Sequence, residues 1–465
     1  MSSIFGLNIA LSAIRAQQYA MDVTGHNIAN ANTPGYRRQE AILIANDPMS
    51  GSFGTTGVGM PQLGTGVLVH SVRRAQTDFL DTQVRTANQW MGTWDARNTA
   101  LGQLEPLLAE PGDAGLSAAI NRFWNSWYDL SAAPESLPSR VAVVESGVAL
   151  ADRIQTLHHD LRALQVDTDG RIAAAAHDIN AIAAEIAGLN EQITQPMPGV
   201  YQPNDLLDRR SELLEKLSQL VRIEVYGQGG VDMIVSVGGR AIIQGNQFAK
   251  IDITTGPTGM SQLVWAEDGS EVLATGGELK GLMEIRDDVV GSYLESLDDI
   301  TEAIITRVNA IHSTGITMSG APAGNFFVPG TTSADIAVNP ALTGSPSEVA
   351  AGVAGNGPGD NWVADSIAKL GDEALIGTET IGSAYSALVA QIGSHAEEAR
   401  MRTEMYTISL NQRRTQRESI AGVSIDEEMV NMVKFQQAYN AAARIFTVID
   451  EMTDLIINRM GIAGR

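Results

Sequence analysis

The sequence predicts a mainly α-helical chain with a β-rich insertion, organised as discontinuous, layered domains. Three observations support this fold class. Apolar residues repeat with helical spacing at both ends of the chain, long helical patterns fill the interior, and a glycine-punctuated, β-rich stretch interrupts them at 222–273. Because helices lie on both sides of the insertion, the chain goes out and returns, and its two ends are expected to meet.

The two ends of the chain each predict an amphipathic helix, and together a coiled-coil-like pair. Apolar residues alternate at three and four positions, which places them on one narrow seam, although Gln18 interrupts the first. Such seams pack within one chain or against neighbouring subunits, and both can hold at once. The predicted interface residues are Ile4, Leu7, Leu11, Ile14 and Met21 in the first helix, and Phe435, Ala438, Ala442, Ile445, Ile449, Met452 and Ile456 in the last.

Four further helical seams predict that helical pairs and bundles dominate the interior. The first ends before a loop that contains Pro196 and Pro198, since proline cannot continue a helix. The seams run from Ile172 to Ile193, from Leu206 to Leu220, from Met283 to Ile311 and from Ile381 to Tyr406.

Between the second and third of these helices the character of the chain changes. Short β-rich runs at 222–226, 233–237 and 241–244 are separated by Gly-rich turns and predict a small β insertion. The stretch 313–360 is rich in Gly, Pro, Ser and Thr, so surface loops and short strands are expected there. The Gly-rich segment 51–66 is interpreted as a flexible connector.

Three domains follow from this order of elements. The inner domain contains the two terminal helices, the middle domain is a helical bundle, and the outer domain is β-rich. Their predicted bounds are 1–50 with 422–465, then 51–221 with 276–312 and 360–421, then 222–275, and whether 313–359 joins the outer domain stays open.

Composition excludes several classes of protein. The 54 acidic residues outnumber 31 basic ones, and the net charge of −23 argues against nucleic acid as a partner and favours a self-repelling monomer before assembly. No apolar run approaches the roughly 20 residues of a membrane span. The chain has no cysteine, and residues 1–21 lack the pattern of a signal peptide, so any export would need another route.

The sequence predicts no catalytic, cofactor-binding or metal-binding site, and therefore no enzyme. It contains no His-Glu-x-x-His pair, P-loop, Gly-x-Ser-x-Gly elbow or cysteine nucleophile. His158 and His159 are adjacent, so a helix would turn them about 100° apart, which favours a surface over a metal site. A calcium loop at 165–176 fails because Gln165 and Ala176 occupy its first and twelfth positions.

The segment after the first helix has the chemistry of a chain turn. Asn and Thr side chains can bond local backbone groups, Pro34 fixes φ, and Gly35 permits a conformation that other residues avoid. On physical grounds alone it predicts a capped helix end followed by a loop. The motif residues are Asn27, Asn30, Asn32, Thr33, Pro34, Gly35, Tyr36 and Arg37.

A capping box predicts where the last helix starts. Ser424 can accept from an orphan backbone N–H, and Glu427, three residues later, can reach back. Asp426, Glu427 and Glu428 lie in the first turn, where the helix dipole favours each negative charge by about 0.3–1 kcal/mol. We expect these carboxylates to be structural.

The run 22–36, Asp-Val-Thr-Gly-His-Asn-Ile-Ala-Asn-Ala-Asn-Thr-Pro-Gly-Tyr, closely resembles the signature of the flagellar axial proteins, the superfamily of rod, hook and hook-associated proteins. The signature does not select one member. The segments 203–221 and 422–452 are similar to the hook-associated members. A rod or hook protein is the close alternative, and a secreted hydrolase with flagellar-type termini is a distant one, for which 222–273 offers no catalytic group.

The resemblance implies a structural subunit of the extracellular bacterial flagellum that joins hook to filament, with no cofactor. It implies four kinds of partner: further copies of the chain in a ring-like junction zone, the hook protein, the next hook-associated protein on the filament side, and a flagellar export chaperone. Export would use the flagellar type III apparatus without signal cleavage. The terminal seams would then be the assembly contacts.

Overall fold

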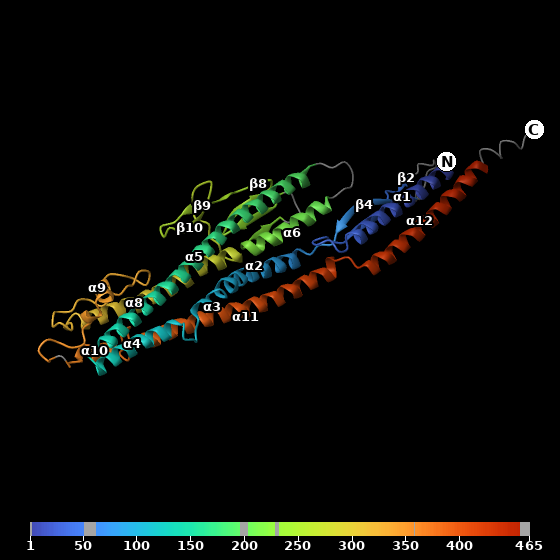
Figure 1. Ribbon diagram of the computed structural model, residues 1–465. Coiled ribbons are helices and arrows are strands. Elements are labelled where there is room, and N and C mark those ends of the chain that lie inside the picture. The colour runs from blue at the N-terminus through green and yellow to red at the C-terminus, as the bar shows by residue number, and fades with distance from the viewer. Residues whose placement is uncertain (1, 51–61, 196–202, 228–231, 358, 456–465) are drawn as a thin grey trace, which may run out of the picture. The chain divides into compact units, whose positions relative to one another are not determined.

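The computed structural model describes residues 2–50, 62–195, 203–227, 232–357 and 359–455. The chain forms two compact units, each assembled from separate stretches of sequence. Unit 1 comprises Met1–Asn88, Ile179–Lys250 and Ile408–Arg465, and unit 2 comprises Gln89–Asp178 and Ile251–Thr407. Long helices and small antiparallel sheets confirm the predicted fold class (Figure 1). The division into three domains stays a prediction.

Unit 1 contains the predicted pair of terminal helices, α1 (Ser2–Ala29) and α12 (Ile425–Asp454). They run antiparallel and side by side (Figure 1), because Gly6 lies against Ile449 while Gly25 lies against Met432. A Cβ on Gly6 would come within 3.0 Å of Ile449 Cδ1, so the helices approach closely there. The deepest apolar positions of α1 are small: Ala10, Ala16 and Ala20.

A β-hairpin that the sequence analysis missed packs on α1. Strands β1 (Gln39–Ala45) and β4 (Val67–Arg74) pair antiparallel, with Gln39 opposite Arg74 and a register shift after Ile42. The backbone N–H of Val67 donates to Ser12 Oγ at 3.2 Å. The two-residue strands β2 (Met49–Ser50) and β3 (Gln62–Leu63) extend the same connection, so the predicted connector is partly a hairpin, and its residues 51–61 lie outside the described chain.

The rest of unit 1 is built around α6 (Asn204–Leu220) and a four-stranded antiparallel sheet. The strands follow sequence order in the sheet and confirm the β runs predicted at 222–244. They are β5 (Glu224–Tyr226), β6 (Ile234–Val237), β7 (Arg240–Gln244) and β8 (Gln247–Phe248). Three long helices contribute residues to both units: α2 (Asp78–Leu101), α5 (Leu137–Thr194) and α11 (Ile381–Ala421).

Unit 2 adds a hairpin and a set of shorter helices to these long ones. The hairpin pairs β9 (Ile251–Thr255) with β10 (Ser261–Trp265). The predicted seam from Met283 is interrupted, because a π-helical turn, η1 (Glu284–Val289), connects α7 (Gly277–Met283) to α8 (Val290–His312). The remaining helices are α3 (Leu104–Leu108), α4 (Leu116–Ala132), α9 (Pro340–Gly344), the 3-10 turn η2 (Pro346–Glu348) and α10 (Trp362–Lys369).

The core of unit 2 is aromatic and fully enclosed. Phe123 of α4 packs against Phe326 and Phe327, and Trp127 packs against Phe326, with ring centroids 5.3–5.8 Å apart. All four side chains are 0% exposed. The prediction of surface loops at 313–360 is therefore wrong for this part of the segment. Its apolar residues have no helical or strand period, so sequence pattern alone could not place them in the core.

One described helix is long and apolar enough to span a membrane by length and composition alone. An 18-residue window of α5 has a mean hydropathy of 1.2, and 44% of it is buried within the protein. The apolar residues of this helix pack as a core helix does: Leu150, Ile154, Leu161, Ile172, Ile179 and Ile186 are all 0% exposed. Burial inside the fold accounts for its hydropathy.

Candidate functional site

The predicted interface residues of the terminal helices lie on two different faces. On α1, Leu7, Leu11, Ile14 and Met21 are half-buried. The first position, Ile4, is helical, but its side chain lies outside what the structure describes, so four positions of this seam can be placed. They contribute to the packing of α1, and their part in assembly stays a prediction.

On α12 the predicted seam separates into an inner and an outer set. Phe435, Ala438 and Ile449 are half-buried and Ala442 is buried, as expected for residues near α1. Two others do not pack on α1: Ile445 and Met452 are 55% and 60% exposed, because a straight helix with 3.6 residues per turn drifts from a 3.5-residue repeat. Their part in assembly stays a prediction. Phe446 and Thr453, the next residues along the chain, are half-buried instead. Ile456 lies outside the described residues.

The motif that follows α1 forms a polar joint with the start of α12. Asn27 is 1% exposed and makes four hydrogen bonds. Its Nδ2 donates to the Gln39 carbonyl at 2.8 Å and to Glu428 Oε2 at 2.9 Å, and its Oδ1 accepts from Gln39 N at 3.0 Å and from the Tyr36 hydroxyl at 2.8 Å. Burial, with nearby carboxylates second, raises the pKa of Tyr36, which therefore stays a neutral donor.

The exposed part of the motif is the predicted turn. Thr33 Oγ1 donates to Asn30 Oδ1 at 3.2 Å, and Asn30 Nδ2 donates back to the carbonyl of His26 at 3.1 Å. Gly35 has φ of 80°, where a side chain would strain the backbone. Asn32 and Pro34 are exposed on this turn. These contacts end α1 and direct the chain into β1.

The first turn of α12 is anchored by its carboxylates. Ser424 is the N-cap, and its Oγ accepts from Glu427 N at 3.5 Å, which confirms half of the capping box. The Glu427 carboxylate instead lies 3.5 Å from Arg38. Glu428 is 2% exposed and accepts from Arg38 Nε at 2.8 Å, in addition to its bond with Asn27. The acidic residues are structural, as expected.

Two buried ion pairs extend the joint into α2 and α6. Arg37 makes a two-pronged contact with Asp81 of α2, with both N–O distances 2.7 Å, and Arg74 of β4 lies 2.8 Å from Asp208 of α6. All four side chains are 5–7% exposed. The Arg37 backbone N–H also donates to Asp208 at 3.1 Å. Burial raises the pKa of Asp208, although the charge of Arg74 opposes that rise.

The end of α11 closes the joint from a further side. Arg417 pairs with Glu215 of α6 and lies 3.9 Å from Asp81. The backbone N–H of Arg38 donates to the carbonyl of Ala421 at 2.9 Å. The joint thus links α1, β1, β4, α2, α6, α11 and α12, and all of its residues belong to unit 1.

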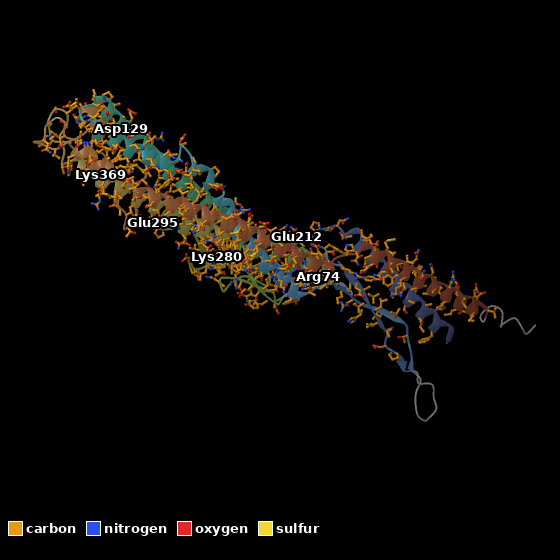
Figure 2. The ribbon with its side chains drawn as sticks, turned by 90° about the horizontal axis from the view of Figure 1, so that it is seen from below. Arg74, Asp129, Glu212, Lys280, Glu295 and Lys369 are labelled. Atoms are coloured by element: carbon orange, nitrogen blue, oxygen red, sulfur yellow. The ribbon has the colours of Figure 1, made fainter. Side chains whose placement is uncertain are left out.

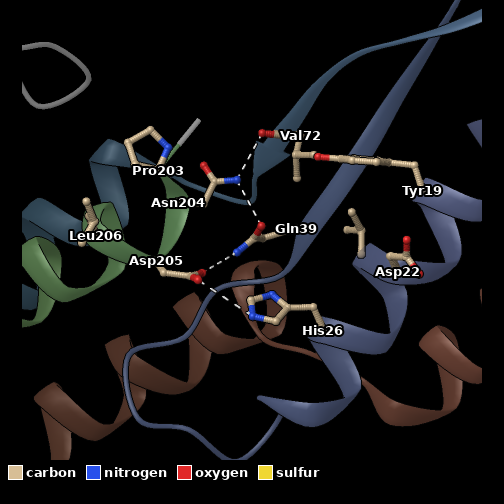
Figure 3. A pocket seen from close by; sticks show the side chains of 10 residues that line it. Tyr19, Asp22, His26, Gln39, Val72, Pro203, Asn204, Asp205 and Leu206 are labelled. Atoms are coloured by element: carbon tan, nitrogen blue, oxygen red, sulfur yellow. Dashed lines mark hydrogen bonds and ion pairs between the residues drawn. The ribbon is translucent and has the colours of Figure 1, made fainter. Parts of the chain in front are cut away.

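A hollow of about 620 Å³ opens beside the joint (Figure 3). Asp205 at its edge accepts from Gln39 Nε2 at 3.0 Å and lies 3.9 Å from His26 Nε2. Asn204 donates to Gln39 Oε1 at 3.1 Å and to the carbonyl of Val72 at 3.2 Å. The polar groups in Figure 3 mainly bond one another, which is the pattern of a structural joint.

The other polar groups considered in the sequence have structural partners. His158 Nδ1 lies 2.7 Å from Ser333 Oγ. Asp169 accepts from Ser261 N at 2.9 Å and from Arg286 Nη1 at 2.6 Å, so its carboxylate joins α5 to the β9–β10 hairpin and η1. Over the described residues, no three His, Asp or Glu side chains gather in a way that could hold a metal ion.

Comparison with known proteins adds two matches that coincide with the joint. Residues 7–37 match the flagella basal body rod protein family, and residues 415–459 match the C-terminal family of the flagellar basal body rod FlgEFG proteins. These two segments are the α1 and α12 sides of the joint. The fold and the joint therefore define an axial protein of the bacterial flagellum.

The intervening region narrows the class to one family. Residues 101–327 match the helical domain of the flagellar hook-associated protein FlgK. Flagellar hook-associated protein 1 of Bacillus subtilis is 31% identical, over 100% of both chains, and that of Salmonella typhimurium is 24% identical, over 98% of this chain and 100% of its own. The chain belongs to the flagellar hook-associated protein 1 family and is a structural subunit of the hook–filament junction.

A solved structure has the same fold. The flagellar hook junction protein FlgK from Burkholderia pseudomallei superposes with a TM-score of 0.64, at 16% identity, over 74% of this chain and 100% of its own. The family membership bears out the resemblance seen in the sequence and sets aside the rod and hook alternatives. Among the residues that sequence reasoning missed, Asp81, Asp208 and Glu215 complete the joint, and no local pattern marked them.

Proposed function

We propose that copies of this chain assemble through the outer face of α12, while its inner face packs on α1. The observation that carries this proposal is that α12 has exposed apolar residues outside the face that packs on α1. The outer face is formed by Val430, Val433, Ile445, Val448, Met452 and Leu455, which are 47–69% exposed. Exposed stripes of this kind on a helix are typical of an interface.

The spacing of these residues supports one contact surface. At about 100° per residue they fall on one side of the helix and form a stripe, interrupted between Val433 and Ile445, roughly a third of a turn away from the buried Glu428 and Ala442. Fully burying an aliphatic side chain contributes about 1.5–3 kcal/mol, and these half-exposed residues would each contribute about half of that. Repetition in every subunit multiplies the gain.

Charge supports a second copy of the chain as the occupant of this surface. Arg15 of α1 and Lys434 and Arg444 of α12 are exposed, and none of them forms an ion pair with another described residue. Asp22 and Asp450 are exposed on the same two helices. A neighbouring copy offers both signs of charge on the same two helices, so staggered copies can pair them.

The joint supports a second part of the proposal, which concerns load. Its buried ion pairs hold the α1–α12 pair to α2, α6 and α11 with specific geometry, whereas surface ion pairs would be screened and weak. We propose that the joint transmits mechanical load between the assembled terminal helices and the rest of unit 1. The inner domain predicted from 1–50 and 422–465 would then be the assembling layer.

The remaining partners and the location follow from family membership as proposals. The junction zone would contact the hook protein on one side and the next hook-associated protein on the filament side. An export chaperone would hold the chain before type III export to the extracellular flagellum. We propose no catalytic activity, no nucleic-acid partner and no membrane span for this subunit.

The test is a variant in which the outer face of α12 is made polar: Val430→Gln, Ile445→Gln and Met452→Gln together. Gln favours helices, so the helix itself should persist. In cells that lack the native gene, electron microscopy should show hooks without filaments, and flagellin should be lost to the medium. Normal filaments would refute the assignment of this face.

A matched control separates loss of the interface from loss of apolar surface in general. Val166, Leu273 and Met318 of unit 2 are 49–61% exposed. Replacing these three with Gln should leave filaments intact. Circular dichroism of both purified variants checks that each folds.

A further inference from the structure

We infer that the acidic charge of unit 2 holds free copies of the chain apart, so that self-association through α12 requires screening by salt. This inference rests on the proposed function, because it concerns the regulation of the same contact surface. Its partner is a second copy of the chain.

The charge of the chain is divided very unequally. Unit 1 contains 20 acidic and 19 basic residues, a net charge of −1, whereas unit 2 contains 34 acidic and 12 basic residues, a net charge of −22. Almost the entire net charge of −23 therefore lies in the unit that does not contain the terminal helices. A sequence-wide average hides this difference.

Helix α8 shows that the charge of unit 2 is concentrated as well as large. Glu295, Asp299 and Glu302 are exposed at positions i, i+4 and i+7, on one face of the helix, and exposed Asp288 precedes them by two turns. Glu295 is labelled in Figure 2. Within the described chain, none of the four forms an ion pair. Like charges at this spacing destabilise a helix, so helix stability does not explain them.

The charged side chains of unit 1 are arranged differently. Its central carboxylates are paired at short range, with Arg37 on Asp81, Arg74 on Asp208 and Arg38 on Glu428. Because the unit is almost neutral, two copies of its helices do not repel each other over long distances. The apolar contact and the repulsion therefore belong to different units of the chain.

The two forces also differ in range. Burial of the α12 stripe acts only at contact, whereas repulsion extends over the Debye length, which is about 30 Å at 0.01 M salt and about 8 Å at 0.15 M. At low ionic strength the repulsion between two chains of charge −23 keeps the stripes from meeting. Added salt shortens the repulsion and leaves the apolar contact in place.

Sedimentation velocity of the purified full chain between 20 and 500 mM NaCl tests the inference. We expect the self-association constant to rise by about tenfold or more over this range, as screening removes the repulsion. The variant with Asp288→Asn, Glu295→Gln, Asp299→Asn and Glu302→Gln should associate at lower NaCl and show a shallower rise. The charge-retaining control, with Asp288→Glu, Glu295→Asp, Asp299→Glu and Glu302→Asp, should match the unmodified chain.

Three results would overturn the inference: association that weakens with salt, no association at any salt concentration, or one common salt dependence for all three proteins, which would indicate general salting-out. Failure of the proposed function is a separate result. Normal filaments in cells carrying the polar α12 variant would refute the contact surface, whereas a common salt dependence would leave that surface standing and refute only its electrostatic regulation.

Discussion

Unit 2 is held together by a closed aromatic core, whereas the terminal helices of unit 1 meet through small residues and are fixed by ion pairs. Phe123, Trp127 and Phe326 are fully buried in unit 2, and aromatic side chains of this size dominate core energetics. In unit 1, the buried apolar residues of α1 are alanines, and each alanine removes little apolar area from water.

The two units therefore differ in the interactions that stabilise them. Buried ion pairs fix geometry but contribute little net stability, because desolvation offsets most of their attraction. Unit 2 can satisfy its apolar surface within one chain, while α12 leaves a second apolar face open. We therefore expect unit 2 to be the stable body of the free chain, and the terminal helices to gain their full stability from neighbours.

The largest expected effect is the loss of stability when the aromatic core of unit 2 is disrupted. Trp127→Ala empties the centre of the aromatic cluster and should lower the free energy of unfolding by about 3–5 kcal/mol. Urea unfolding followed by circular dichroism measures it. Trp90→Ala is the control, because Trp90 is 46% exposed and should cost far less. Equal losses would contradict the closed core.

The next effect breaks the joint of unit 1. Arg37→Met leaves the Asp81 carboxylate buried without its two-pronged partner, and should destabilise unit 1 by about 3 kcal/mol or more. Hydrogen exchange at α1 and α12 should accelerate, while α4 stays protected. The double variant Arg37→Met with Asp81→Leu should recover part of the loss, since both members of the pair are then removed together; a purely additive loss would argue against the pair.

A smaller effect is the pH dependence of the stability of unit 2, which the neutral His312 introduces. Burial lowers the pKa of His312, at the edge of the aromatic cluster, to about 4, although its hydrogen bond with Gly324 opposes the shift. The unfolded chain takes up this proton near pH 6.5, so the contribution to stability is complete above that pH. It is lost as the pH falls towards 4, at up to about 1.4 kcal/mol per pH unit.

Urea unfolding between pH 7 and pH 4 checks this dependence. The variant His312→Gln should be less stable at pH 7 but should lose this part of the pH slope. The control His177→Gln, at an exposed position on α5, should keep the slope. A slope unchanged by His312→Gln would assign the acid sensitivity to another group.

The smallest effect concerns a single helix cap. Ser424→Ala removes the side-chain acceptor at the start of α12 and should cost about 1 kcal/mol, confined to the first turns of that helix. Hydrogen exchange of the backbone amides of residues 427–432 measures this loss of stability directly. Ser419→Ala, in the exposed end of α11, should have no comparable effect. Protection that is unaffected by both changes would mean that the ion pairs of Glu428 alone hold this end.

Local pattern was enough to predict most of the helices, the β runs of unit 1 and both sides of the joint. The seams of α5, α6 and α11 are confirmed because their periodic residues face a core. The exposed residues of α12 were harder to place, since the sequence shows a seam but does not show which helix face meets α1. Ile445 and Met452 continue the seam in the sequence but are exposed in the structure.

Long-range polar contacts could not be predicted from the sequence. Asn27 and Glu428 are 401 residues apart, and the local sequence around either residue does not indicate that the two side chains pair. Asp81 and Asp208 look like ordinary helix-surface carboxylates until the fold buries them beside arginines. The β1–β4 hairpin and the buried part of 313–359 were missed because their residues follow neither a helical nor an alternating period.

The antiparallel pairing of α1 with α12 also sets an order of folding. Every residue of unit 2 precedes Ile408, so its core can close before the last segment of the chain has appeared. Helix α1 must wait for a partner about 400 residues further on, and closing so long a loop is slow. We expect refolding in two phases: a fast phase in which unit 2 folds, and a late phase in which α1 pairs with α12.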